Sequence, residues 1–116
     1  MSSEDYKKSY NIQMDEWSSI VRDSALLLQL AHQKNWSEML SLHEKRDNKL
    51  KQFFNQALVQ DLVDAVQDDL EKIKAQDLEI VQLVKKNQDE LSAEAQQLNM
   101  MKKRINDYLS AEKNKL

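Results

Sequence analysis

The sequence predicts an all-α protein, an antiparallel bundle of three to four helices with a long third helix and a movable C-terminal helix. Two observations support this fold class. The 116 residues include no glycine and no proline, so the residues that most often end or kink a helix are missing throughout the chain. From residue 63 to residue 108, apolar residues also recur at alternating steps of about three and four, which is the spacing of one face of a helix.

This apolar stripe, called the seam below, is interrupted only by Asp77, Asn87 and Glu94. A stripe of this length must be covered by the rest of the chain, by another molecule or by its own folded-back end. The seam consists of Val63, Val66, Leu70, Ile73, Ile80, Val84, Leu91, Leu98, Met101, Ile105 and Tyr108.

Length and composition favour one helical domain, residues 1–116. Hydrophobic residues make up 41% of the chain and charged residues 32%, which provides both a core and a solvated face. No apolar run is long enough to span a membrane, and the polar N-terminus lacks the apolar stretch of a secretion signal. We therefore expect a cytoplasmic protein without membrane insertion. The absence of cysteine excludes disulfides and thiol chemistry and agrees with that compartment.

The net charge of −3 is unevenly distributed along the chain. Residues 61–90 hold nine acidic and four basic side chains, whereas residues 100–116 hold five basic and two acidic ones. The basic end can fold back on the acidic helix or bind an acidic partner, and the sequence leaves both open. Nucleic acid is disfavoured as a partner, because the chain is acidic overall and contains no recognised nucleic-acid-binding motif.

The first helix is expected over residues 11–33, where one broad face is apolar. Residues 34–38 predict a turn, because Asn35 is a good N-cap and Glu38 can complete a capping box. The second helix is expected over residues 36–56 and packs antiparallel to the first, since the link between them is short. Its predicted apolar face consists of Met39, Leu40, His43, Leu50, Phe53, Phe54 and Ala57.

The third helix is expected over residues 61–91, with Asp61 as its N-cap, and a fourth over residues 93–111. Between their apolar parts, residues 87–97 contain one large apolar residue but favour helix through their Ala, Glu and Gln content. This stretch is compatible either with one continuous solvated helix or with a joint near Leu91–Ser92 that starts the fourth helix.

The residue types needed for catalysis or for a metal site are scarce. His32 and His43 are the only histidines, and no metal-binding spacing surrounds them. Acidic pairs such as Asp64 and Asp68 lie on an open helix face, which is unsuited to general acid–base chemistry. Without cysteine and glycine the chain lacks a thiol nucleophile and a phosphate-binding loop. We therefore expect that the protein is not an enzyme and has no catalytic residues, no metal and no cofactor.

Three stretches resemble the FliT-type flagellar export chaperones, which are small cytosolic helical proteins. The first is Ser24–Ala31, a leucine-rich run that leads into a turn at Trp36, and the second is Leu40–Asp47. The third is Asp89–Ser92, followed sixteen residues later by Tyr108. The resemblance extends over most of the chain, roughly Ile20 to Leu109. The combination of the leucine-rich helix, the Trp-led turn and the spaced tyrosine is more specific than any of them alone.

The resemblance implies a chaperone that holds the apolar C-terminal segment of the filament-cap protein in solution and delivers it to the cytosolic domain of the export gate. It also implies contact with the export ATPase complex and, in some members, with the flagellar master regulator, so that flagellar gene expression is regulated. The position that matches the family's gate-docking tyrosine is Tyr108. The link between the second and third helices departs from some members, because it lacks their proline-bearing loop.

The same resemblance implies a last helix that covers the cargo surface and regulates binding. Here that regulatory helix would use Leu98, Met101, Ile105 and Leu109. A cargo helix that displaces it exchanges one apolar contact for another, so a small difference in affinity switches the state. The candidate cargo contacts are the apolar residues left over once one core face is assigned: Leu26, Leu30, Leu78, Val81 and Leu83.

A structural coiled-coil or helical-bundle protein is the alternative function. In that case the chain homodimerises through the seam from residue 63 to residue 108, and the polar residues Asp77 and Asn87 fix the register. A regulator that sequesters a transcription factor would use the same surfaces, and the sequence does not separate it from a chaperone.

Overall fold

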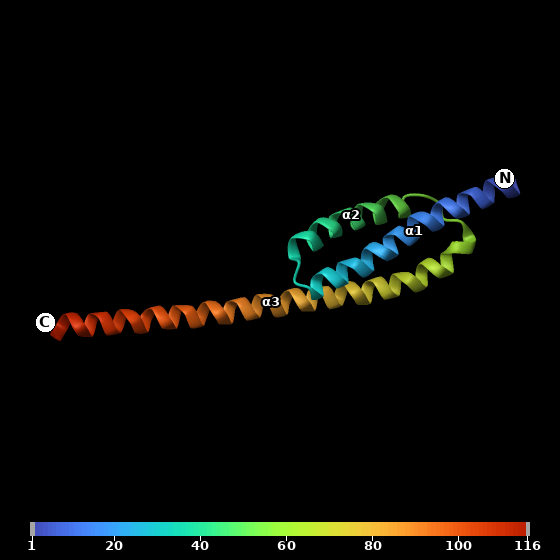
Figure 1. Cartoon of the computed structure of the whole chain (residues 1–116). Coiled ribbons are helices and arrows are strands. Elements are labelled where there is room, and N and C mark those ends of the chain that lie inside the picture. The colour runs from blue at the N-terminus through green and yellow to red at the C-terminus, as the bar shows by residue number, and fades with distance from the viewer. Residues whose placement is uncertain (1, 116) are drawn as a thin grey trace. The chain divides into compact units, whose positions relative to one another are not determined.

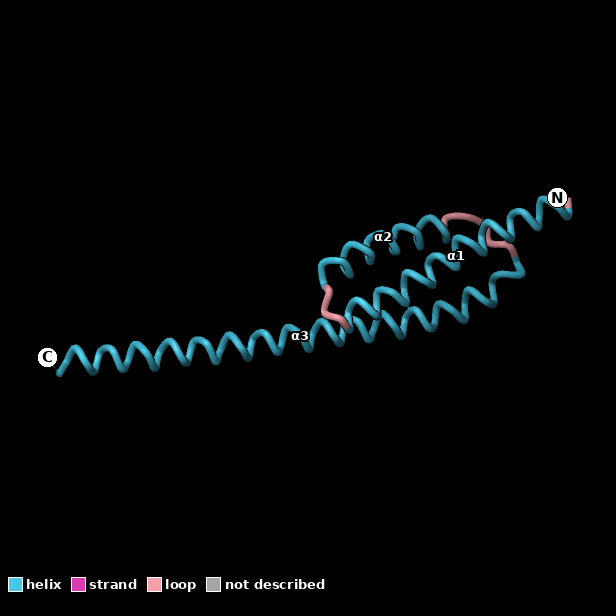
Figure 2. The backbone as a smooth tube through the Cα atoms, viewed as in Figure 1, coloured by secondary structure: helices cyan, strands magenta, loops and turns pink. Residues whose placement is uncertain are grey.

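The computed structural model describes the backbone of residues 2–115 and the side chains of residues 2–97, 99, 100, 103, 105 and 107. Its helices are α1 (Ser3–His32), α2 (Trp36–Phe54) and α3 (Gln60–Lys115), as Figure 1 shows. Short loops connect them (Figure 2). Every element assigned in residues 2–115 is helical and the helices pack together, so the predicted all-α bundle is confirmed. The chain divides into two compact units, Met1–Leu83 and Val84–Leu116.

The first helix, α1, begins at Ser3, eight residues before the start expected at Asn11. The Ser2 hydroxyl group caps it by accepting a hydrogen bond from the backbone N–H of Asp5 at 3.2 Å. Glu4 and Asp5 lie in the first turn, where carboxylates interact favourably with the helix dipole. The polar N-terminal residues therefore form part of the helix instead of preceding it.

The turn between α1 and α2 closes without glycine. Lys34 adopts a left-handed conformation, with φ of 58°. Its backbone N–H bonds to the carbonyl of Ala31 at 3.1 Å, and the N–H of Asn35 bonds to that of Leu30 at 2.9 Å. These are the two hydrogen bonds of a Schellman motif, in which glycine is usual at the left-handed position. Asn35 is the N-cap of α2 as predicted, but its side chain makes no capping bond, so the expected capping box does not form.

The loop between α2 and α3 is held by one buried glutamine. α2 ends at Phe54 and α3 begins at Gln60, within two residues of the predicted boundaries. The Gln13 side-chain amide donates to the carbonyl of Ala57 at 3.0 Å and accepts from the N–H of Val59 at 2.8 Å. One side chain therefore satisfies loop backbone groups that would otherwise need a turn residue or water.

The third helix, α3, is assigned as helix through Leu91 and Ser92, where the sequence allowed a joint. The helices expected separately over residues 61–91 and 93–111 are therefore one secondary-structure element. The reason is local: this stretch contains strong helix formers and no residue that breaks a helix.

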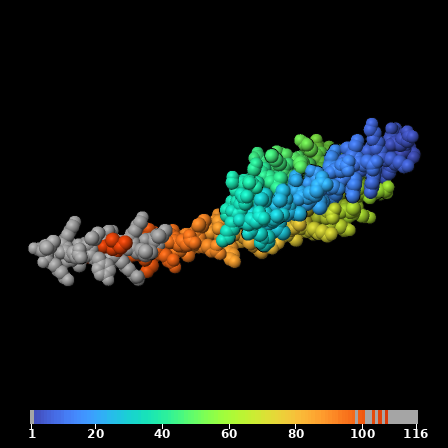
Figure 3. All heavy atoms as spheres, in the orientation of Figure 1, coloured from blue at the N-terminus to red at the C-terminus, as the bar shows by residue number. Residues whose placement is uncertain are grey.

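The core of the Met1–Leu83 unit forms around Trp17 and Phe53, whose ring centroids lie 5.1 Å apart. Both side chains are buried, and α3 contributes the first part of the seam to the same cluster. Figure 3 shows the side chains of α1 and α2 closely packed over the first part of α3. The buried cluster consists of Trp17, Ile20, Phe53, Leu62, Val66 and Ile73.

Hydrogen bonds between α1 and α3 set the directions of the helices. The Tyr6 hydroxyl group donates to Asp61 at 2.6 Å, and Trp17 Nε1 donates to Asp69 at 2.9 Å. Because residue numbers rise together along both helices, α1 and α3 are parallel and α2 is antiparallel to both (Figure 1). The bond to Asp61 also raises the pKa of Tyr6 above its ordinary value, with desolvation as a smaller cause.

A buried arginine, Arg46 of α2, joins all three helices. Its guanidinium group donates to both carboxylate oxygens of Asp77 on α3, at 2.7 and 2.9 Å, and to Ser24 Oγ on α1 at 3.3 Å. The neighbouring Asp47 accepts two more bonds, at 3.0 and 3.2 Å. Desolvation lowers the pKa of Arg46, but Asp77 and Asp47 together outweigh it and raise the pKa, so the group stays charged. Asp77 interrupts the seam because it neutralises this cation.

We predict that Asp77→Asn lowers the free energy of unfolding by about 2 to 3 kcal/mol, because the buried guanidinium loses its two-bond carboxylate partner. Urea denaturation followed by circular dichroism measures the change. Lys74→Ala is the control, since it removes an exposed 3.3 Å pair with Glu71 and should cost less than about 0.5 kcal/mol. Equal losses in the two variants would contradict the role assigned to Asp77.

Candidate partner-binding surface

Three of the five predicted cargo contacts are exposed in the structure. Leu26 is 43% exposed, Leu78 60% and Val81 61%. Leu83 is half-buried, and Leu30 is buried at 8% exposure. Leu30 therefore offers little surface to a partner in this conformation, whereas the exposed leucines and the valine are available for contact.

The five residues do not form one continuous surface. Leu78 and Val81 are one turn apart on α3 and lie on the same side of it. Leu83 follows Val81 by two residues, which places it about 160° around the helix. Leu26 follows Trp17 by nine residues, or about 180°, so it lies on the side of α1 opposite to the side chain that bonds α3. Only Leu78 and Val81 remain together.

The structure adds Leu40 of α2 to this pair. Leu40 is 64% exposed. Because α2 and α3 are antiparallel and Arg46 bonds Asp77, residues before Arg46 lie level with residues after Asp77. Leu40 precedes Arg46 by six residues and Val81 follows Asp77 by four, so their heights along the bundle differ by about 3 Å.

Leu40 and Val81 are also linked through residues that bond Arg46. On α2, Leu40, His43 and Asp47 follow one another at helical spacing, and His43 Nε2 lies 3.5 Å from Asp47 Oδ2. Asp47 and Asp77 accept hydrogen bonds from the same guanidinium group, and Val81 is one turn beyond Asp77 on α3. We call this candidate site the α2–α3 surface and define it as Leu40, Leu78 and Val81.

The predicted apolar face of the second helix was wrong for three residues, Leu40, Phe54 and Ala57, the last of which is exposed and lies beyond the end of α2. Leu40 was assigned to the core together with Met39, but adjacent residues are about 100° apart on a helix and Met39 takes the buried position. Phe54 is 45% exposed, although its ring packs edge-on against Trp17 at 6.0 Å. The sequence does contain a signal for Leu40. Met39 and Leu40 are adjacent large apolar residues on one helix, so only one of them can point into the core.

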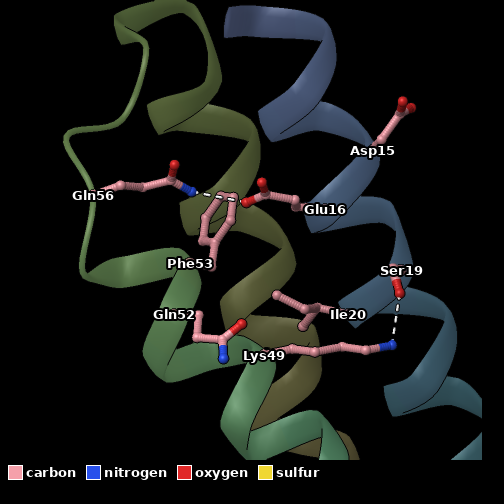
Figure 4. A pocket seen from close by; sticks show the side chains of 8 residues that line it. All are labelled: Asp15, Glu16, Ser19, Ile20, Lys49, Gln52, Phe53 and Gln56. Atoms are coloured by element: carbon pink, nitrogen blue, oxygen red, sulfur yellow. Dashed lines mark hydrogen bonds between the residues drawn. The ribbon is translucent and has the colours of Figure 1, made fainter.

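A depression with a volume of about 490 Å³ lies between α1 and α2 (Figure 4). Lys49 Nζ donates across it to Ser19 at 2.8 Å and to Asp23 at 2.7 Å, and Gln56 Nε2 donates to Glu16 at 2.9 Å. These hydrogen bonds join α1 to α2 across the depression and hold the two helices together there. Its lining consists of Asp15, Glu16, Ser19, Ile20, Lys49, Gln52, Phe53 and Gln56.

The two histidines each lie beside a carboxylate. His32 Nε2 is 3.2 Å from Glu79 Oε1, and His43 pairs with Asp47 as described above. Within the residues that the structure describes, no three side chains of metal-binding type gather at one place. The contacts of both histidines are those of partly exposed surface pairs.

The Val84–Leu116 unit also exposes apolar side chains. Leu91 is 56% exposed, Met100 59% and Ile105 55%. Ile105 is one of the predicted regulatory residues. The other residues predicted for regulation or gate docking lie outside the described side chains: Leu98, Met101, Tyr108 and Leu109.

Exposed apolar side chains on the helices of a bundle are the kind of surface on which an amphipathic partner helix can bind. A family model described as flagellar protein FliT matches residues 14–110 of this chain. The match spans most of the chain and includes all three stretches of the resemblance, so the chain belongs to the FliT family of flagellar export chaperones. No curated protein and no solved structure matches it. Among residues 2–115, no helix combines the length and apolar character that crossing a bilayer requires.

Proposed function

We propose that this protein is a cytoplasmic chaperone that binds the apolar C-terminal segment of the flagellar filament-cap protein and delivers it to the cytosolic domain of the export gate. The family match over residues 14–110 is the observation that supports this most strongly. The exposed apolar side chains of the α2–α3 surface provide a place for such cargo.

The cargo segment binds as an amphipathic helix, because a helix with one apolar face can cover a shallow apolar surface between two other helices. Leu40, Leu78 and Val81 make the principal contacts, since each is at least 60% exposed before binding. Leu26 and Leu83 face other sides of the bundle, so they contact cargo only where the cargo segment extends beyond the α2–α3 surface. Leu30 takes part only when α1 shifts, because it is buried in the unloaded protein.

The Val84–Leu116 unit provides the regulatory and docking residues in this proposal. Its apolar residues cover the cargo surface until cargo displaces them, and Tyr108 contacts the export gate. The export ATPase complex and the flagellar master regulator are the further partners, and the latter contact links cargo export to flagellar gene expression. The proposed regulatory residues are Leu98, Met101, Ile105 and Leu109.

A structural protein that dimerises along the whole seam has less support. Val66, Ile73 and Ile80 belong to the first part of the seam, and they are buried inside their own chain. Pairing of the whole seam with a second copy would require that core to open, which would expose the apolar surface it now buries.

We predict that the C-terminal peptide of the cap protein binds this protein in isothermal titration calorimetry and that the Leu78→Ser, Val81→Ser double variant binds at least about tenfold more weakly. Loss of two apolar contacts accounts for this change. Ile12→Ser is the matched control, because Ile12 is 49% exposed on α1 and lies outside the α2–α3 surface. Both variants should keep the free energy of unfolding within about 0.5 kcal/mol. Failure of the unaltered protein to bind the peptide would overturn the proposed function.

Removal of residues 92–116 should strengthen binding of the same peptide, because the proposed regulatory residues can then no longer compete for the cargo surface. The comparison is between full-length and shortened protein at equal peptide concentrations. Unchanged or weaker affinity in the shortened protein would contradict the regulatory role of the C-terminal helix.

Tyr108→Ala should leave helicity and peptide affinity intact and weaken binding to the cytosolic domain of the export gate. Circular dichroism, titration calorimetry and a pull-down with the gate domain measure these three properties. Tyr108→Phe is the matched control for the aromatic ring. If Tyr108→Ala instead lowers the thermal unfolding midpoint, the tyrosine stabilises the fold and its docking role is contradicted.

A further inference from the structure

Arg46 and Asp77 lie opposite each other at core positions of two helix faces that are otherwise apolar. Each residue follows the spacing of three and four that defines the inward face of its helix. The Arg46 side chain is 2% exposed and that of Asp77 is 38% exposed. The apolar residues of the two faces are Met39, Leu42, Leu50 and Phe53 on α2 and Leu70, Ile73 and Ile80 on α3. Two apolar side chains at the positions of the ion pair would complete both faces.

An apolar pair at these positions would stabilise the bundle at least as well as the ion pair does. Removing a guanidinium group from water is costly, and replacing a buried ion pair by apolar residues of similar volume is often neutral or stabilising. The other partners of Arg46 would remain satisfied. Ser24 Oγ also donates to the carbonyl of Ile20 at 2.9 Å, and the Asp47 side chain is 39% exposed, so water can replace its bonds. A gain in net stability therefore does not explain the ion pair.

The ion pair supplies one defined height of α2 along α3. Apolar contacts are non-directional, so two apolar faces can slide by one turn and still be buried. After such a slide Arg46 would lie level with Ile73 or Ile80, which are one turn before and after Asp77 and offer no acceptor. A polar residue within an apolar helix interface is a known means of fixing helix register.

The same bonds select which of two neighbouring side chains of α2 points into the core. Met39 is 4% exposed and Leu40 is 64% exposed, although both are large and apolar. Arg46 follows Met39 by seven residues, or nearly two full turns, so the two side chains lie on the same side of α2. A rotation of α2 that buried Leu40 would therefore turn the guanidinium group away from both carboxylate oxygens of Asp77.

We propose that Arg46 and Asp77 are positioning residues for partner binding: their ion pair holds α2 at the height and rotation that bring Leu40 level with Val81, with no net gain in stability. The binding part of this inference rests on the proposed function, whereas the alignment of α2 does not. Without the ion pair α2 occupies several arrangements, and affinity falls in proportion to the fraction of molecules that keep the competent one.

The full-length double variant Arg46→Met, Asp77→Leu tests the effect on binding. Its thermal unfolding midpoint should equal or exceed that of the unaltered protein, whereas Asp77→Asn alone should lower it. Its affinity for the C-terminal peptide of the cap protein should fall at least about tenfold, as expected when about one molecule in ten keeps the competent alignment. The matched control is Lys49→Met, Asp23→Leu, which removes a 2.7 Å ion pair between α2 and α1 and should leave peptide affinity unchanged.

Cysteine labelling tests the alignment without cargo, since the chain has no cysteine of its own. In the otherwise unaltered protein, a thiol reagent should react with Leu40→Cys at least about tenfold faster than with Met39→Cys, because reaction at a buried position requires local opening. In the Arg46→Met, Asp77→Leu background the ratio of the two rates should fall at least about threefold, as other rotations of α2 become populated.

The two measurements separate this inference from the proposed function. Failure of the unaltered protein to bind the peptide would overturn the proposed function, and the labelling ratio would still decide the alignment. An unchanged labelling ratio in the folded double variant would overturn the inference, and so would unchanged peptide affinity. A double variant less stable than Asp77→Asn would also overturn it, because the ion pair would then serve stability.

Discussion

A guanidinium group buried in an apolar core must have fixed acceptors, because an unpaired buried charge costs several kcal/mol. Arg46 meets this requirement with one partner on each of the other helices, Ser24 on α1 and Asp77 on α3. Apolar contacts are non-directional, so helices joined only by them can shift along one another. The two hydrogen bonds from Arg46 to Asp77 would break on such a shift. Arg46 therefore fixes the height of α2 against α3. The α2–α3 surface depends on that height, since it brings Leu40 level with Val81.

The loops depend on similar polar contacts, because the chain has no glycine or proline to form its turns. Gln13 satisfies the loop between α2 and α3 from within α1, and Lys34 takes the left-handed position that glycine usually occupies. A left-handed lysine costs about 1 to 2 kcal/mol relative to its ordinary conformation. The two Schellman hydrogen bonds offset part of that cost. The arrangement of the helices therefore depends more on side-chain hydrogen bonds between them than on the turn preferences of the loop residues.

Local properties of the sequence predicted the helices and most of the core, because apolar periodicity and helix propensity act within a few turns. The division of the seam could be predicted only in part. The loss of apolar residues after Val84 indicated two segments, but the reason for Asp77 in the first segment lies in Arg46, which is 31 residues away. The α2–α3 surface was missed in part for the same reason. Whether Leu40 or Met39 points into the core depends on how α2 is rotated, and the ion pair between helices sets that rotation.

The exposed part of the seam has a consequence for the energetics of binding. A single helix in water is marginally stable even when its residues favour helix, so the Val84–Leu116 unit gains stability from whatever covers Leu91 and Ile105. A partner helix with one apolar face would supply such a contact. Because a ligand that binds only the ordered form stabilises that form, the stability of this helical unit is coupled to the binding of its partner.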